Sequence, residues 1–110
     1  MRVYEFVFNK EEDRNYVKKS FFDMFRDCED FKTKKITLSS AEDTKADETK
    51  YQLFISVDDV AAGSYSVIVS NAFNQNLYIR FICVKDGTSD THVDLPSDVK
   101  ILSWYNEDVA

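Results

Sequence analysis

Residues 2–8 alternate between two sets of side chains, and this alternation predicts a β-strand. One set is Tyr4, Phe6 and Phe8, and the other set is also largely apolar. A strand that is apolar on both faces is typical of the interior of a sheet. We therefore expect residues 2–8 to form an interior strand.

The hydrophobic period becomes helical after Asn9. Asn9 and Glu12 have the spacing of a helix N-cap and its N3 partner, and the acids at residues 11–13 suit the positive end of the helix dipole. Apolar residues then recur three and four positions apart, which predicts a helix from about Lys10 to residue 27 or 28. The expected core stripe is Val17, Phe21, Met24, Phe25 and Cys28.

Five further runs read as strands. Residues 51–57 alternate cleanly, residues 65–70 contain consecutive β-branched side chains, and residues 77–84 give the strongest strand pattern in the chain. A weaker run at residues 31–38 carries three lysines, as expected of an edge strand that must resist pairing with other chains. The last predicted strand covers residues 99–105.

Two polar segments separate these runs. Residues 39–50 contain no large apolar side chain, which predicts an exposed acidic loop. Ser39 and Glu42 also have capping-box spacing, so a short surface helix is the alternative there. Residues 85–98 are polar, include Pro96, and predict a long connection.

The order of elements is β-α-β-β-β-β-β, and most connections are too short for crossovers. This order predicts an α+β fold in which one N-terminal helix packs on a mainly antiparallel sheet of about five to six strands. The sheet becomes mixed if the first β-α-β unit places its two strands parallel. A chain of 110 residues suits a single domain spanning residues 1–110.

The composition argues against several classes of enzyme. With only Gly63 and Gly87, the chain has neither a P-loop nor a dinucleotide-binding fingerprint, and no Ser has the flanking glycines of a nucleophile elbow. One His leaves a single imidazole base. Cys28 and Cys83 are isolated in apolar patterns, so we expect free thiols and a reducing, cytoplasmic location. We predict a protein that is not an enzyme and needs no cofactor.

One short segment offers potential metal ligands. In an extended chain Asp90, His92 and Asp94 project to the same side, where two carboxylates and an imidazole meet. The alternative is a solvated loop whose Asp side chains cap turns. We predict the loop, and keep metal binding as a minor alternative.

The acidic surplus is the clearest signal for function. Twenty Asp and Glu against fourteen Lys and Arg give a net charge of −6. On the predicted helix, Asp23, Asp27 and Asp30 form one stripe at the end where the dipole disfavours anions, so local stability does not explain them. Lys19 and Arg26 could neutralise this stripe as an ordinary solvated face. The other clustered acids are Glu42, Asp43, Asp47 and Glu48 in the loop, and the pair Asp58 and Asp59.

These acids predict a small protein-binding domain of the inhibitor or immunity type. Its carboxylates would cover the basic, nucleic-acid-binding or nuclease surface of a target protein, as a nucleic-acid mimic does in anti-restriction and anti-CRISPR inhibitors. The same charge argues against direct contact with nucleic acid or with an anionic membrane. One alternative is a structural or adaptor subunit that associates through a sheet edge or through exposed aromatics such as Trp104 and Tyr105. A second alternative is a domain that binds a small ligand or a metal.

Overall fold

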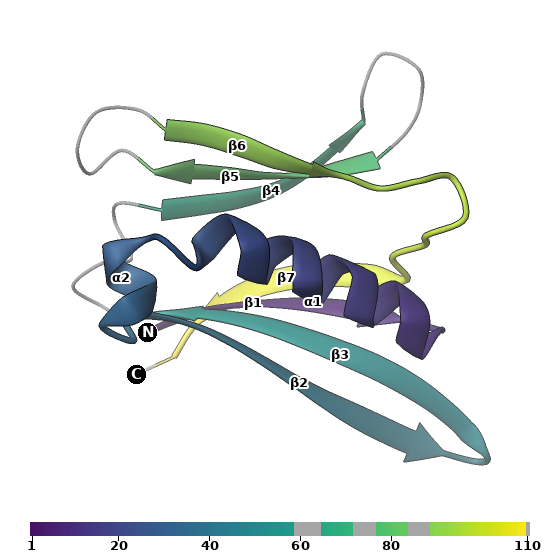
Figure 1. Cartoon of the computed structure of the whole chain (residues 1–110). Helices are drawn as coiled ribbons and strands as arrows, with labels where there is room; N and C mark the ends of the chain where they lie inside the picture. Colours follow the sequence, from purple (N-terminus) through teal and green to yellow (C-terminus); the bar gives the residue numbers. More distant parts are fainter. Residues whose placement is uncertain (59–64, 72–76, 84–88, 110) are drawn as a thin grey trace.

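The computed structural model describes residues 1–58, 65–71, 77–83 and 89–109, and these form an α+β fold (Figure 1). The predicted fold class is confirmed: one long helix packs on antiparallel sheet, and strands predominate. The elements are β1 (Arg2–Phe8), α1 (Glu11–Phe25), α2 (Glu29–Lys32), β2 (Ile36–Lys45), β3 (Glu48–Val57), β4 (Tyr65–Asn71), β5 (Leu77–Cys83), β6 (Ser89–Asp94) and β7 (Ser103–Asp108).

The described strands form two antiparallel sheets, whereas the sequence pattern predicted one. The first has the order β2-β3-β1-β7 and the second the order β4-β5-β6. A mixed sheet is wrong for the described pairs, because β1 pairs antiparallel with both β3 and β7. After α1 and α2 the chain forms a hairpin of β2 and β3. The second strand of this hairpin, β3, pairs with β1, so β2 lies at the sheet edge and does not pair with β1.

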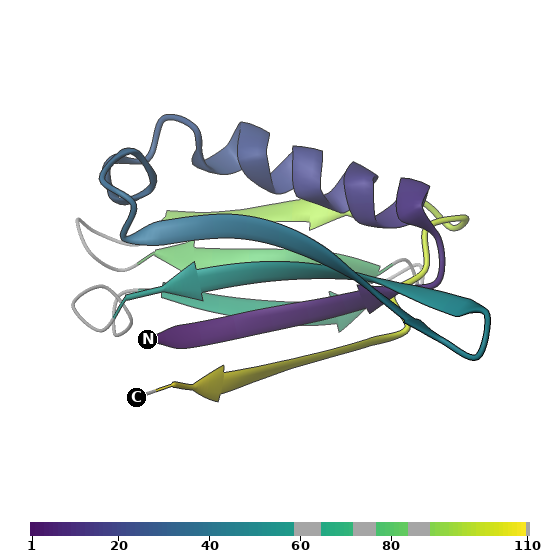
Figure 2. The same ribbon diagram turned by 90° about the horizontal axis from the view of Figure 1, so that it is seen from below.

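One core joins the helix to both sheets. Figure 1 shows α1 running between the two sheets, and Figure 2 shows it along one side of both. Tyr4, Phe6 and Phe8, which the alternation placed on one face of β1, are all buried in this core. The Phe6 and Phe21 ring centroids lie 6.1 Å apart, and those of Phe25 and Phe81 lie 4.6 Å apart, which connects β1 and β5 through α1. Each ring buried in this way contributes roughly 1.5–3 kcal/mol.

The helix is shorter than predicted at both ends. Lys10, and not Asn9, is its N-cap residue, and the Asn9 side chain instead accepts a hydrogen bond from Lys50 Nζ at 2.6 Å. At the other end α1 stops at Phe25, and α2 begins at Glu29. Of the acids that would oppose the dipole at the end of one long helix, Glu29 and Asp30 thus lie in the favourable first turn of a second helix, whereas Asp23 stays in the last turn of α1.

The prediction of a loop at residues 39–50 is wrong. Nearly all of this segment belongs to the β2–β3 hairpin, which pairs from Ile36↔Val57 to Lys45↔Glu48. Ala46 and Asp47 form the turn with φ of 50° and 64°, as a two-residue turn of type I′ requires. The outer half of the hairpin projects beyond α1 in Figure 1 and has little core to cover, which explains its polar sequence.

The predicted connection at residues 85–98 also contains a strand. β6 occupies Ser89–Asp94, and Leu95 behind it is 2% exposed. The last strand begins at Ser103, later than the predicted residue 99, because Val99 and Ile101 pack on the core before the chain enters the sheet. Lys32 likewise ends α2, so the weak strand pattern at residues 31–38 becomes a strand only from Ile36.

Candidate functional site

The predicted acidic stripe on the helix is divided by the break between α1 and α2. Asp23 and Asp27 are exposed, as predicted. Asp30 is 2% exposed, and its carboxylate accepts a hydrogen bond from the buried Tyr65 hydroxyl. The assignment of Asp30 to a partner-binding surface is therefore wrong. A continuous helix would have kept Asp30 beside Asp27, but the start of α2 turns it into the core.

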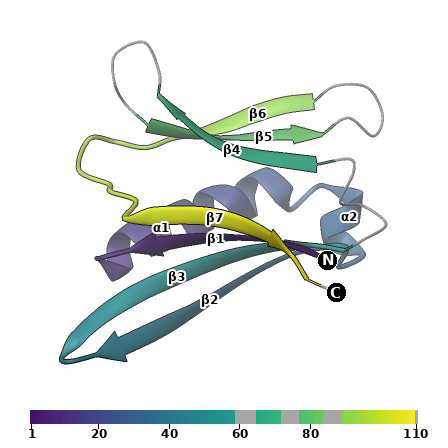
Figure 3. The ribbon, with the colours of Figure 1, turned by 180° about the vertical axis from the view of Figure 1, so that it is seen from behind.

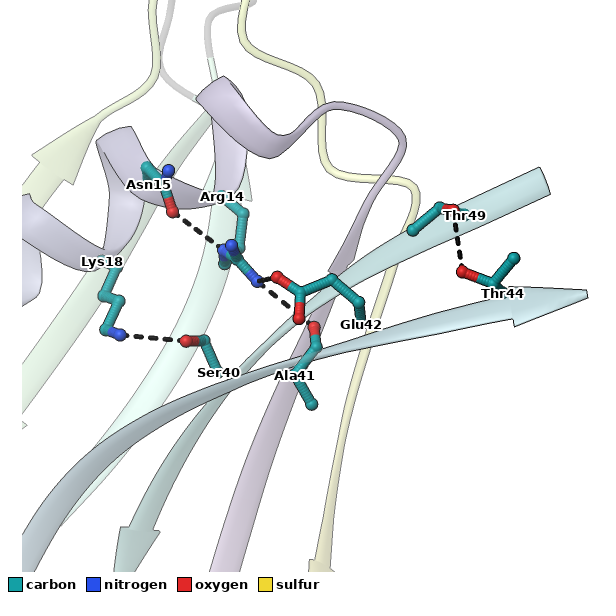
Figure 4. Close-up of polar contacts among 8 residues, drawn as sticks. All are labelled: Arg14, Asn15, Lys18, Ser40, Ala41, Glu42, Thr44 and Thr49. Carbon is teal, nitrogen blue, oxygen red and sulfur yellow. Dashed lines mark hydrogen bonds and ion pairs between the residues drawn. The ribbon is translucent and has the colours of Figure 1, made fainter. Parts of the chain in front are cut away.

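Acids of the β2–β3 hairpin pair with cations of the same chain. Glu42 Oε1 lies 3.0 Å from Arg14 Nη1, and Asp43 Oδ2 lies 3.7 Å from Lys45 Nζ (Figure 4 draws the first pair). Arg14 is 5% exposed and also donates to the Ala41 carbonyl at 3.2 Å, so the Glu42 pair ties α1 to β2.

The remaining predicted acids lie at or near the turns. Glu48 pairs with Lys50, and the hydrogen bond from this ammonium lowers the pKa of Glu48 below its ordinary value. Asp47 is exposed in the hairpin turn. Asp58 is half-buried after β3, where its N–H donates to the Lys35 carbonyl at 2.9 Å. Asp59 lies outside the described residues.

A groove between α1 and β6 brings together two features that the sequence presented separately. It encloses about 490 Å³ and contains Asp23 from the predicted stripe together with His92 and Asp94 from the segment for which metal binding was the minor alternative. Helical spacing places the α1 residues on one side of the helix, and strand alternation leaves His92 and Asp94 exposed while Val93 is buried. The remaining lining residues are Tyr16, Ser20, Met24 and Val93.

The groove is polar, open and anionic. The His92 Nε2 and Asp94 Oδ1 atoms lie 3.4 Å apart, and the two side chains are 56% and 79% exposed. The His92 ring packs edge-on against Tyr78, with centroids 5.5 Å apart. Two carboxylates on different elements can hold one cationic group between them. No Lys or Arg is among the described residues that line the groove.

The minor metal hypothesis gains no support from the described side chains. Among them, no group of three or more His, Cys, Asp or Glu residues is placed to hold a metal ion. The Asp90 side chain lies outside the described part, so the structure does not test the full set of three potential ligands.

The β7 strand forms a free edge of the four-stranded sheet, as Figure 3 shows. All six of its residues are exposed, with Trp104 at 49% and Tyr105 at 52%. Met1 and Val109 form a hydrogen-bonded pair, in which each backbone N–H donates to the other residue's C=O. Hydrogen-bonded and non-hydrogen-bonded pairs alternate along antiparallel strands. The backbone N–H and C=O groups of Trp104, Asn106 and Asp108 therefore point away from β1. The edge therefore presents open backbone groups with aromatic side chains beside them.

Sequence reasoning missed the groove as a unit. The sequence pattern singled out Asp23, His92 and Asp94 separately. It assigned no role to Ser20, and it placed Met24 in the hydrophobic core. The i, i+4 and i+7 spacing of Tyr16, Ser20 and Asp23 places them on one helix face. Contact between that face and β6 depends on tertiary packing, which the local pattern does not encode.

Comparison with protein-family models, curated proteins and solved structures finds no match for this chain. Within the described residues, neither helix has the length and apolar character that crossing a membrane would require. Cys28 is a free cysteine, in line with the expectation from the sequence.

Proposed function

We propose that this chain is a non-enzymatic protein-binding domain of the inhibitor or immunity type, which covers a basic nucleic-acid-binding or nuclease surface of a target protein. The observation that carries the proposal is the α1–β6 groove, where Asp23 and Asp94 face a common space lined by no Lys or Arg among the described residues. An Arg or Lys side chain of the target enters this groove and meets both carboxylates.

The groove suits an arginine in particular. A guanidinium presents several N–H donors in a fixed plane and forms two parallel hydrogen bonds with a carboxylate. Tyr16 lines the same groove and is 43% exposed, so its ring is available for a cation–π contact. Asp27 is exposed in the turn that follows α1, four residues after Asp23.

The other predicted acids have a secondary role in this proposal. Glu42, Asp43 and Glu48 each pair with a Lys or Arg side chain of the same chain, whereas the neighbour of Asp94 is the imidazole of His92, so the three hairpin acids add less to the attraction of a target than Asp23 and Asp94. The net charge of −6 still speeds encounter with a basic protein, and this contribution weakens with salt.

The direct test uses NMR titration of the isotope-labelled protein with a short arginine-containing peptide. We expect chemical-shift changes at Asp23, His92 and Asp94 and weaker binding as salt rises. The variant Asp23→Asn/Asp94→Asn should lose at least about tenfold in affinity, since hydrogen bonds between charged groups contribute roughly 1.5–3 kcal/mol.

The matched control is Asp98→Asn/Glu107→Gln, which makes the same change in net charge at exposed positions outside the groove. The parent protein, the groove variant and this control are then used as bait in affinity capture of natural targets from the native host, at low and at high salt. Equal losses in both variants, or retention of a basic target by Asp23→Asn/Asp94→Asn, would overturn the groove as the binding site.

The β7 edge favours a second candidate, an adaptor that associates by strand addition. The outward N–H of Asn106 can be removed by Asn106→Pro without loss of a β1–β7 hydrogen bond, because edge strands tolerate proline on the open side. This candidate would be supported if light scattering shows an oligomer that is insensitive to salt and that dissociates into monomers in the Asn106→Pro variant. A monomer at all concentrations would argue against self-association through β7.

A further inference from the structure

A second groove lies between α1, α2 and β2, and it shares no lining residue with the α1–β6 groove. It encloses about 390 Å³, a volume in the usual range of small-ligand sites. Its described lining residues are Asn15, Lys18, Lys19, Phe22, Phe31 and Leu38.

One end of this groove is apolar. Phe22 is 50% exposed, and its ring meets the edge of Phe31 with centroids 6.0 Å apart at an interplanar angle of 79°. Phe31 and Leu38 are half-buried and rest on the hydrophobic core. A concave surface of two rings and an aliphatic side chain can therefore shelter an apolar tail at little cost in rearrangement.

The other end presents hydrogen-bond donors. Asn15, Lys18 and Lys19 precede Phe22 on one face of α1, at i, i+3, i+4 and i+7 spacing. Lys18 Nζ donates to Ser40 Oγ at 2.9 Å, which holds the ammonium near β2 and leaves further N–H donors for a ligand (Figure 4). Asn15 Oδ1 accepts from Arg14 Nε at 2.9 Å, so its amide NH₂ group is the side available to a ligand.

The charge of the groove opposes that of the whole chain. The described lining residues include two lysines and no acid, although the chain carries a net charge of −6. Cations gathered beside an apolar surface complement a molecule with a carboxylate at one end and a hydrocarbon at the other.

We propose that the α1–α2–β2 groove binds a small amphipathic carboxylate of the medium-chain fatty-acid type. Its carboxylate lies between Lys18 and Lys19, and its tail packs on Phe22, Phe31 and Leu38. This site is independent of the anionic α1–β6 groove, which takes ligands of opposite charge.

The test is an NMR titration with three probes that share a tail: octanoate, 1-octanol and octylammonium. We expect octanoate to shift the resonances of the lining residues and to bind at least about tenfold more tightly than octylammonium at low salt, because charge-assisted hydrogen bonds contribute roughly 1.5–3 kcal/mol. Raising the salt should narrow this difference.

Two variants separate the charged end from the apolar end. Lys18→Gln/Lys19→Gln should weaken octanoate about tenfold and leave 1-octanol unchanged, since only the charge-assisted contacts are lost. Phe22→Ser should weaken both probes, and its half-exposed ring makes loss of folding unexpected. The matched control, Lys10→Gln/Lys45→Gln, removes the same charge from exposed side chains outside the groove.

Four results would overturn the proposal. These are the absence of octanoate shifts at the lining residues, equal binding of octanoate and octylammonium, the same loss in the control as in Lys18→Gln/Lys19→Gln, and binding of an acidic aromatic peptide without binding of octanoate. The last result would assign the groove to a peptide.

Discussion

Replacing Tyr65 by Phe tests the reassignment of Asp30 from a binding residue to a structural one. The change removes one hydroxyl group and keeps the ring, which stacks on Phe81 with centroids 5.2 Å apart. The Asp30 carboxylate stays in place, 2% exposed, without the hydrogen bond that Tyr65 donates.

The expected loss follows from burial and charge. A hydrogen bond to a charged group contributes roughly 1.5–3 kcal/mol, and Tyr65 is itself only 4% exposed, so water replaces the lost donor poorly. Unfolding entropy near 60 °C is about 2.1 cal/mol/K per residue, or roughly 230 cal/mol/K for 110 residues. The melting temperature should therefore fall by about 6–13 °C.

Urea denaturation and calorimetry of four proteins measure this effect: the parent, Tyr65→Phe, Asp30→Asn and the double variant. Tyr105→Phe is the control, because it deletes the same hydroxyl from a ring that is 52% exposed, and it should change stability by less than about 0.5 kcal/mol. The double-mutant cycle isolates the coupling between the two side chains. If Tyr65→Phe lowers the free energy of unfolding no more than Tyr105→Phe does, the argument from burial is refuted.

Three further predictions concern the core, the hairpin turn and one carboxylate. Phe21→Ala should destabilise the fold by about 3–5 kcal/mol in urea denaturation, because its ring is fully buried; a loss below about 1 kcal/mol would contradict this. Ala46→Asn should stabilise the fold by about 0.5–1 kcal/mol in the same assay, since φ of 50° suits Asn better than Ala; an unchanged midpoint would count against the turn geometry. In an NMR pH titration Glu48 should titrate below its ordinary pKa, and Lys50→Gln should move that pKa upward. The pKa of Glu48 is lower in the folded than in the unfolded state, so its ion pair stabilises the fold above the unfolded-state pKa, and this stabilisation is lost as pH falls through the folded-state pKa. Equal Glu48 titration midpoints in the parent and in Lys50→Gln would refute the pairing.

The fold class and the central elements could be predicted from the sequence because their patterns are strong and local. The alternation of β1 and the apolar stripe of α1 each give a clear period, and both lie where that period places them. The start of β2 falls within the predicted edge strand at residues 31–38, but its continuation to Lys45 escaped prediction because a strand segment with little core to cover gives no clear alternation. The division into two sheets was also missed, since strand patterns identify strands and leave their pairing open.

The candidate sites were only partly predictable for the same reason. Asp23 and Asp94 are separated by most of the chain, and only the packing of α1 on β6 makes them neighbours. Asp30 shows the opposite error, since a helical wheel assumes a continuous helix and the chain breaks after Phe25. Trp104 and Tyr105 were correctly named as exposed aromatics.

The pairing of β1 with β7 has a consequence for the order of folding events. Met1 and Val109 exchange hydrogen bonds although they are 108 positions apart, whereas the β2–β3 hairpin closes through a two-residue turn. Closing a flexible loop of that length costs on the order of 4 kcal/mol in chain entropy, so the seam between the chain ends should form after the hairpin. Substitutions in this seam should then accelerate unfolding while leaving the refolding rate nearly constant, and stopped-flow kinetics can resolve this difference.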